Sequence, residues 1–172
     1  MIFGLFRKPP HAAEVALLYG AIMAQTRLAA FYLPPYGAPD TFEGRFEILT
    51  LHAGLLLRRL GELPAPGPDL AQQLSNAVFA NLDDALREIG ISDVGVPKKM
   101  KKLAAAFMGR GVAYANALQE SEAALAEALS RNILAGEGDG IALAHYVRAT
   151  TALFASTPLE AFLRGELIFP AP

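Results

Sequence analysis

Apolar residues recur at every third or fourth position along most of this 172-residue chain, and this spacing constrains the fold more than any other feature. It places the apolar side chains on one face of a helix, whereas no stretch shows the alternation of a half-buried strand. The repeat is clearest between Asp69 and Ile89, where a leucine or valine returns about every fourth residue. The pattern predicts an all-α fold, a compact single-domain bundle of about six helices plus a short C-terminal helix.

Proline and glycine clusters divide this pattern into segments. We expect helices at about 12–30, 40–62, 69–89, 97–118, 121–135 and 139–154, followed by a short helix near Thr157. The 40–62 segment has the widest apolar band, so it is expected at the centre of the bundle. A helical domain of residues 11–172 would then follow an N-terminal tail of residues 1–10.

Residues at the segment ends match the preferences of helix termini. Asp40, Asp69 and Ser121 are expected to cap the helices that they begin. Pro97 fits the first position of a helix, where its missing N–H is no loss. Gly90 can take the positive φ that often ends a helix.

The composition excludes several classes of protein. The formal net charge is −2, so no DNA binding is expected from bulk electrostatics, and any basic site must be local. The chain has no cysteine, hence no disulfide, no thiol nucleophile and no cysteine-ligated metal. No apolar run reaches the length of a membrane span, and the N-terminus does not resemble a signal peptide. A cytoplasmic protein is therefore expected.

The first eight residues, MIFGLFRK, place apolar side chains before two basic ones. Such a segment can dip into a membrane surface. The alternative is a frayed terminus that packs partly on the domain. The first interpretation would make the protein peripheral at the inner face of the cytoplasmic membrane.

Residues that could support catalysis or hold a metal are sparse. His11 and Glu14 have the spacing of half a di-iron site, but no second motif of this kind exists. His52 lies amid apolar residues, one heptad after Arg45, and is expected to be a hydrogen-bonded core histidine. We therefore predict neither an enzyme nor a cofactor or metal site. A helical protein that binds a small molecule in a pocket near His52 is an alternative.

Four lysines, Lys98, Lys99, Lys101 and Lys102, form a basic cluster at the start of the 97–118 segment; we call them the lysine patch. The positive end of a helix dipole disfavours cations there. The patch is either solvated or directed at an anionic surface. Lipid headgroups would attract it by about 1 kcal/mol per lysine, and RNA phosphates would attract it too. A peripheral lipid-binding protein is therefore a second alternative.

Two blocks of residues, in this order, resemble a known family. The first contains Phe31-Tyr32, Gly37 to Thr41, Gly44 to Phe46, Leu51-His52 and Leu57 to Leu60. The second contains Leu86 to Gly90, Asp93, Val96 to Lys99 and Phe107 to Arg110. Together they resemble the ubiquinol–cytochrome c chaperone family, the assembly factors of the cytochrome bc1 complex related to mitochondrial Cbp3. The family pattern has Tyr where Met108 stands and Val where Ala38 stands.

The resemblance implies an all-helical, non-enzymatic chaperone that binds newly made cytochrome b before bc1 assembly. It also makes a small partner chaperone and the ribosome candidate partners. The polar positions that the family pattern carries over are Asp40, Arg45, His52, Arg87, Glu88, Asp93 and the lysines from Lys98 to Lys102.

A client helix of cytochrome b is apolar all round, so the chaperone needs an apolar groove between helices. We expect this groove near Phe31, Tyr32 and Phe46. The lysine patch, with Arg110, would lie at its rim and face an anionic membrane surface. An open apolar groove would favour the chaperone, whereas an enclosed polar cavity around His52 would favour the small-molecule alternative.

Overall fold

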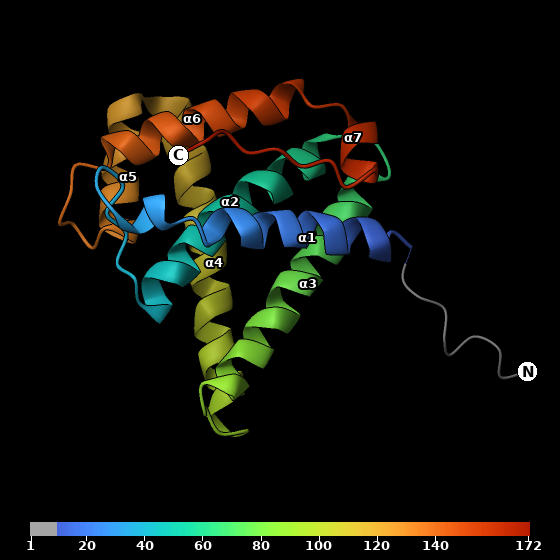
Figure 1. Cartoon of the computed structure of the whole chain (residues 1–172), viewed down its shortest axis with the longest axis horizontal. Coiled ribbons are helices and arrows are strands. Elements are labelled where there is room, and N and C mark those ends of the chain that lie inside the picture. The colour runs from blue at the N-terminus through green and yellow to red at the C-terminus, as the bar shows by residue number, and fades with distance from the viewer. Residues whose placement is uncertain (1–9) are drawn as a thin grey trace, which may run out of the picture.

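The computed structural model describes residues 10–172, and helices account for most of this part of the chain (Figure 1). The helices are α1 (Ala12–Thr26), the 3₁₀ helix η1 (Ala29–Tyr32), α2 (Phe42–Glu62), α3 (Gly67–Glu88), α4 (Gly95–Glu120), α5 (Glu122–Ile133), α6 (Ile141–Ser156) and α7 (Leu159–Leu163). No strand occurs between residues 10 and 172. The predicted all-α bundle is confirmed.

Two predictions concern the membrane: the absence of a membrane-spanning helix and the apolar N-terminal segment. None of the described helices is both long and apolar enough to cross a bilayer. The apolar N-terminal segment, for which membrane contact and a frayed terminus are the two alternatives, lies outside the described residues.

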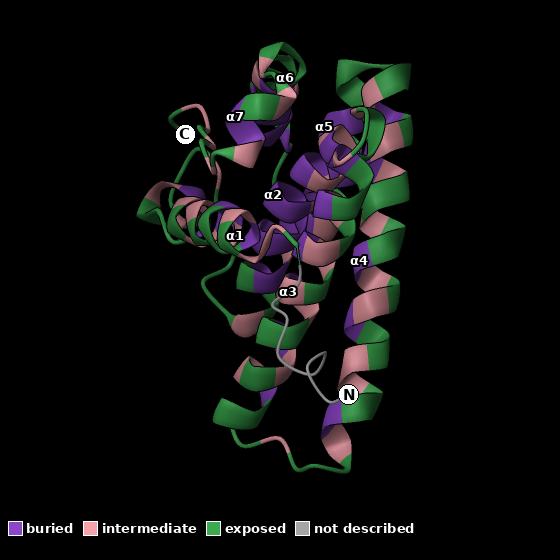
Figure 2. Cartoon of the chain, turned by 90° about the vertical axis from the view of Figure 1, so that its right-hand side faces the viewer, coloured by how far each residue is buried: buried purple, intermediate pink, exposed green. Residues whose placement is uncertain are grey.

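The helix α2 lies at the centre of the bundle, as its broad apolar band predicts. It packs against α1, α3, α4, α5 and α6. Between Ile48 and Ala53 every residue is buried, so side chains on all faces of the helix are covered from solvent here. Figure 2 shows buried residues concentrated along α2. A side chain that is fully buried here contributes about 1.5–3 kcal/mol through apolar transfer.

The first helix ends earlier than predicted. It stops at Thr26 instead of continuing to about residue 30, because the backbone becomes extended at Leu28 and then forms η1. The Tyr32 hydroxyl donates a hydrogen bond to the Thr26 carbonyl at 2.7 Å, which holds this turn in place. The turn separates two neighbouring aromatic residues, since Phe31 is fully buried and Tyr32 is only half-buried.

Three of the predicted helix starts are shifted by one to three residues. The α2 helix is capped by Thr41, whose Oγ1 accepts from the Gly44 N–H at 3.1 Å, and not by Asp40. Asp69 lies in the first turn of α3, which begins at Gly67, and Pro97 is the third residue of α4. These shifts follow from local turn geometry that residue preferences do not resolve.

Two other helix ends match the prediction. Ser121 caps α5, and its Oγ accepts from the Ala124 N–H at 3.0 Å. Gly90 follows α3 with φ 86°, and its N–H bonds to the Arg87 carbonyl while the Ile91 N–H bonds to the Leu86 carbonyl. This pair of bonds is a Schellman motif.

The helices α3 and α4 form a hairpin that extends away from the other helices. Figures 1 and 2 both show the connection between them standing clear of the rest of the molecule. Arg87 fixes this connection by pairing with Asp83 one turn earlier and with Asp93 in the connection itself. The lysine patch follows directly, in the first turns of α4.

Candidate functional site: an apolar groove beside the central helix

An apolar groove, which we call the α2–α4 groove, lies between α2, α3 and α4 and encloses about 340 Å³. Its lining residues are apolar or glycine except for Thr50, Arg58, Ser75 and Tyr114. The lining residues are Thr50, Leu51, Gly54, Leu55, Leu57, Arg58, Ser75, Phe107, Met108, Gly111, Val112, Tyr114, Ala115 and Leu118.

Exposed apolar side chains of α4 border the groove on the solvent side. Met108 is 66% exposed and Val112 is 61% exposed, although both are large apolar residues. The core face of the same helix is formed by Leu103, Phe107 and Tyr114, which are buried. Apolar surface therefore continues from the groove onto the outside of α4, which is typical of a surface that another molecule covers.

Two glycines inside helices keep the groove open. Gly54 of α2 and Gly111 of α4 both line it, and a Cβ added at either position would meet no atom within 4 Å. Glycine inside a helix costs about 0.5–1 kcal/mol relative to alanine. The chain thus loses helix stability at two positions where a side chain would occupy the groove.

The polar groups near the groove are suited to structure and not to acid–base chemistry. Arg110 of α4 binds Glu47 of α2 through two hydrogen bonds of 2.9 and 3.1 Å, and both side chains are partly buried. The Tyr114 hydroxyl lies near this pair, and burial raises its pKa well above the usual range, so it stays protonated. The Thr50 hydroxyl has no hydrogen-bond partner among residues 10–172. The groove offers an apolar contact surface.

A second and smaller hollow, which we call the Tyr32 hollow, lies on the other side of α2 and encloses about 200 Å³. It brings together Tyr32, Arg45 and Phe46, three residues that we expect at the client site. The Arg45 guanidinium stacks 5.5 Å from the Tyr32 ring centre and pairs with Asp40 at 2.6 Å. This hydrogen bond lowers the pKa of the Asp40 carboxyl. The Tyr32 hollow therefore carries the Arg45–Asp40 ion pair, whereas the α2–α4 groove is mostly apolar and has Arg58 as its one charged lining residue.

Phe31 and His52 do not lie at either hollow. Both have no exposed surface, and their rings pack edge to face with centres 5.0 Å apart. The expected groove is therefore displaced from Phe31, because the η1 turn directs this side chain into the core. A buried residue has no surface to offer a client.

We call the buried cluster around this histidine the His52 centre. The ring Nδ1–H donates to the Ile48 carbonyl at 2.8 Å, so Nε2 can accept from the Tyr146 hydroxyl, also at 2.8 Å. Gln25 donates to the Tyr146 oxygen at 3.0 Å. Burial lowers the pKa of His52 to about 4 and raises the pKa of Tyr146 to about 12, so both are neutral near pH 7. The prediction of a hydrogen-bonded core histidine is confirmed.

His52 does not line the α2–α4 groove or the Tyr32 hollow. A small molecule bound near His52 stays an untested alternative. Among residues 10–172, no three His, Asp or Glu side chains are close enough together to hold a metal ion.

The remaining predicted residues lie at the α3–α4 hairpin. Lys98, Lys101 and Lys102 are exposed, and within the described chain none of the three forms an ion pair. Lys99 instead turns to α2, where its Nζ lies 3.6 Å from Glu43 and 5.2 Å from the Phe42 ring centre. Arg110 lies apart from these lysines and is neutralised by Glu47. Arg87 and Asp93 bind each other, whereas Glu88 is exposed.

Sequence reasoning missed Gly54, Gly111, Met108 and Val112 as groove residues. A signal for them exists, because glycine is a poor helix former and both glycines interrupt strongly helical segments. Met108 and Val112 are apolar residues that fall outside the buried face of α4. Glycines inside a helix, followed by apolar residues off its core face, together indicate an open apolar surface.

Comparisons with known proteins agree with this architecture. A family model described as "Ubiquinol-cytochrome C chaperone" matches residues 35–169. The crystal structure of the Cbp3 homolog from Brucella abortus is similar, with 38% sequence identity and a TM-score of 0.83. The match covers 92% of this chain and 90% of that one. No curated protein matches the chain significantly.

Proposed function

The chain belongs to the ubiquinol–cytochrome c chaperone family, and from this premise we propose that it holds newly made cytochrome b in the α2–α4 groove before bc1 assembly. The protein acts by binding and not by catalysis. It works peripherally at the inner face of the cytoplasmic membrane, where the client is inserted. A small partner chaperone and the ribosome stay predictions, because no residue described above argues for either.

The observation that carries this proposal is the open apolar groove with Met108 and Val112 exposed at its border. A transmembrane helix is apolar on all sides and aggregates in water unless an apolar surface covers it. Covering Met108 and Val112 would contribute about 1–2 kcal/mol each. The unbranched thioether of Met108 can adapt to differently shaped side chains.

The α2–α4 groove is a better client site than the Tyr32 hollow that lies nearer to the predicted position. The Tyr32 hollow is smaller and contains the Arg45–Asp40 ion pair at its edge. An apolar helix docked there would have to desolvate charged groups without pairing them. The α2–α4 groove has one charged lining residue, Arg58, which already pairs with Glu62 at 3.0 Å, and the rest of its lining is mostly apolar.

The proposal is tested by filling the groove without unfolding the bundle. Gly54→Leu and Gly111→Leu each place a side chain in the groove, since nothing lies within 4 Å of the added Cβ. Gly109→Leu is the matched control. Gly109 is in α4, like Gly111, and a Cβ added there also meets no atom within 4 Å, but Gly109 does not line the groove. The readouts are recovery of cytochrome b with the captured protein in mild detergent, and the cellular yield of bc1 complex.

We expect the two groove variants to recover several-fold less cytochrome b than the wild type, while Gly109→Leu behaves as the wild type. Circular dichroism and thermal unfolding are the checks that each variant is folded. Equal recovery of cytochrome b by the filled and control variants would overturn the groove as the client site.

A further inference from the structure

The end of the α3–α4 hairpin, residues 89–102, exposes large apolar side chains away from the groove; we call it the hairpin tip. Val94 is 89% exposed and Ile89 is 57% exposed. Ile91, between them, is half-buried and packs against the core. Two apolar side chains at the end of a projecting hairpin are unpartnered within the described chain.

Free cations lie beside these apolar residues. Lys98, Lys101 and Lys102 are on the side of α4 opposite the buried Val96 and Leu103. No described carboxylate pairs with any of the three. They also lie in the first turns of α4, whose dipole adds positive potential. An anion that approaches this face would offset the unfavourable interaction of these exposed lysines with the helix dipole.

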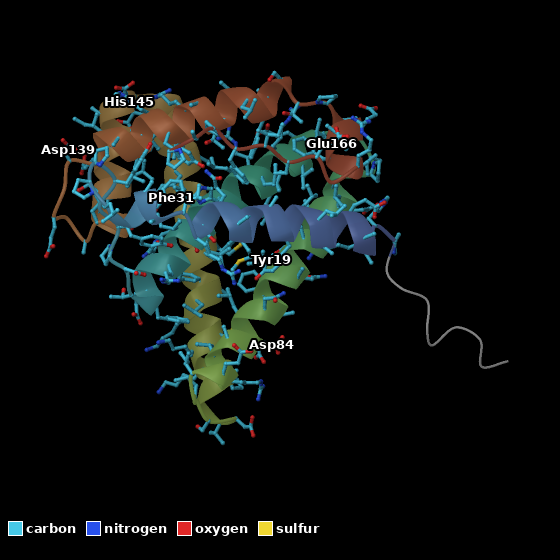
Figure 3. All side chains as sticks on the ribbon, viewed as in Figure 1. Tyr19, Phe31, Asp84, Asp139, His145 and Glu166 are labelled. Atoms are coloured by element: carbon cyan, nitrogen blue, oxygen red, sulfur yellow. The ribbon has the colours of Figure 1, made fainter. Side chains whose placement is uncertain are left out.

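The acidic groups of the hairpin do not cancel this positive face. Asp83 and Asp93 are both bound by Arg87. Asp84 and Glu88 are exposed on α3, and Figure 3 shows Asp84 on the α3 side of the hairpin. The hairpin therefore has an acidic side on α3 and a basic side on α4.

We infer that the hairpin tip docks on an anionic lipid bilayer, with Val94 and Ile89 entering the headgroup layer and Lys98, Lys101 and Lys102 contacting lipid phosphates. This inference rests on the peripheral location proposed above, but it does not depend on what the α2–α4 groove binds. It assigns membrane contact to a different part of the molecule from client binding.

The shape and composition of the tip favour lipid over RNA or protein. The connection projects clear of the other helices (Figures 1 and 2), so it can touch a flat surface but cannot enclose a helix. Residues 89–102 contain no aromatic side chain to stack on a base. Exposed isoleucine and valine gain from entering a headgroup layer and gain nothing from a phosphate backbone.

The test measures co-sedimentation of the full chain with vesicles of phosphatidylglycerol and phosphatidylcholine, and with vesicles of phosphatidylcholine alone. The wild type is expected to bind the anionic vesicles and to be released by salt. The triple variant Lys98→Gln, Lys101→Gln, Lys102→Gln is expected to bind roughly 100-fold more weakly. The triple variant Arg27→Gln, Arg131→Gln, Arg164→Gln removes the same charge from other exposed positions and should bind much more tightly than the lysine variant.

Insertion of the tip can be measured separately, because the chain has no native cysteine. An environment-sensitive fluorophore on Val94→Cys is expected to shift to the blue with anionic vesicles. The same fluorophore on Ile168→Cys, which is 72% exposed on the C-terminal segment, is expected to stay unchanged.

Each contrary outcome has a distinct meaning. Equal loss of vesicle binding in the two triple variants, or no shift at Val94→Cys, overturns docking through the tip. Failure of the wild type to bind anionic vesicles overturns both the tip and the peripheral location, and leaves the groove proposal to its own test. Full vesicle binding by the lysine variant together with a lower bc1 yield assigns the tip to a protein or RNA partner instead.

Discussion

The central helix α2 borders two regions that are built in opposite ways. At the His52 centre, aromatic rings fill the space and every polar atom of the imidazole has a partner. At the α2–α4 groove, only two residues further along, Gly54 leaves space unfilled and the nearby Thr50 hydroxyl has no partner in the described chain. One region gains stability by being closed, and the other loses stability by staying open.

This difference separates the residues that hold the fold from those available to a partner. Closing the His52 centre requires residues from α1, η1, α2, α6 and the C-terminal segment, so it ties the two ends of the described chain together. The groove is formed by consecutive helices and can change without disturbing that cluster. Substitutions in the first region should therefore alter stability, and substitutions in the second should alter binding.

The largest expected difference is between Phe31→Ala and Met108→Ala. Phe31 is fully buried against His52 and Tyr146, so its removal leaves a cavity and should cost about 3–5 kcal/mol of unfolding free energy. Met108 is mostly exposed, and its truncation should change stability by about 0.5 kcal/mol or less. Urea unfolding measures both, and similar losses for the two variants would erase the distinction between the regions.

The His52 centre should also make stability depend on pH. Because burial lowers the pKa of His52 from 6.5 to about 4, the unfolded chain binds the proton more tightly than the folded chain. The stabilisation is fully present above pH 6.5 and is lost as the pH falls from 6.5 to about 4. At about 1.4 kcal/mol per pKa unit the loss is roughly 3 kcal/mol.

The check is the unfolding free energy of the wild type and of His52→Gln at both ends of this pH window. The variant, which has no titrating ring, should lose less stability than the wild type on acidification. Parallel losses in the two proteins would show that the histidine is not held neutral by burial.

Removing the Tyr146 hydroxyl, which binds His52, should lower the unfolding free energy by a smaller amount. Tyr146→Phe leaves the imidazole Nε2 buried without a donor, and should cost about 1–3 kcal/mol. Tyr36→Phe is the control, since the Tyr36 hydroxyl makes no hydrogen bond within residues 10–172 while its ring belongs to the same aromatic cluster. The unfolding temperature of Tyr146→Phe should be well below that of Tyr36→Phe. The reverse order would show that the Tyr146 hydroxyl does not stabilise the His52 centre.

The smallest expected change is a gain in stability, not a loss. Gly111→Ala should raise the unfolding free energy by about 0.5–1 kcal/mol, because alanine is the better helix former and its Cβ meets no atom. Gly109→Ala should stabilise the same helix equally. Only Gly111→Ala should also weaken capture of cytochrome b, and equal capture by both variants would mean that the open space serves no binding role.

The helices could be predicted from the sequence because their signals are local. The leucine repeat of α3, the Ser121 cap and the positive φ of Gly90 each depend on residues within a few positions of one another. Local signals also explain why α2 was expected at the centre. The predictions at Asp40, Asp69 and Pro97 missed by one to three residues, and they concern only which nearby residue begins the helix.

The site could be predicted only in part, because its geometry depends on distant partners. The partner of His52 is Tyr146, which is 94 residues away, and the partner of Arg110 is Glu47, which is 63 residues away. Grouping Arg110 with the lysines by charge alone could not foresee that pairing. Likewise Phe31 and Tyr32 are adjacent in sequence, but the η1 turn sends one into the core and the other to a hollow.

The most direct test of the central claim is photocrosslinking from the border of the groove. A photoreactive amino acid replaces Val112 in one variant and Ile141, an exposed apolar residue outside the groove, in another. During synthesis of cytochrome b, position 112 should crosslink to one of its transmembrane segments and position 141 should not. Equal crosslinking from both positions, or crosslinking from position 141 alone, would contradict the claim that this groove receives the client.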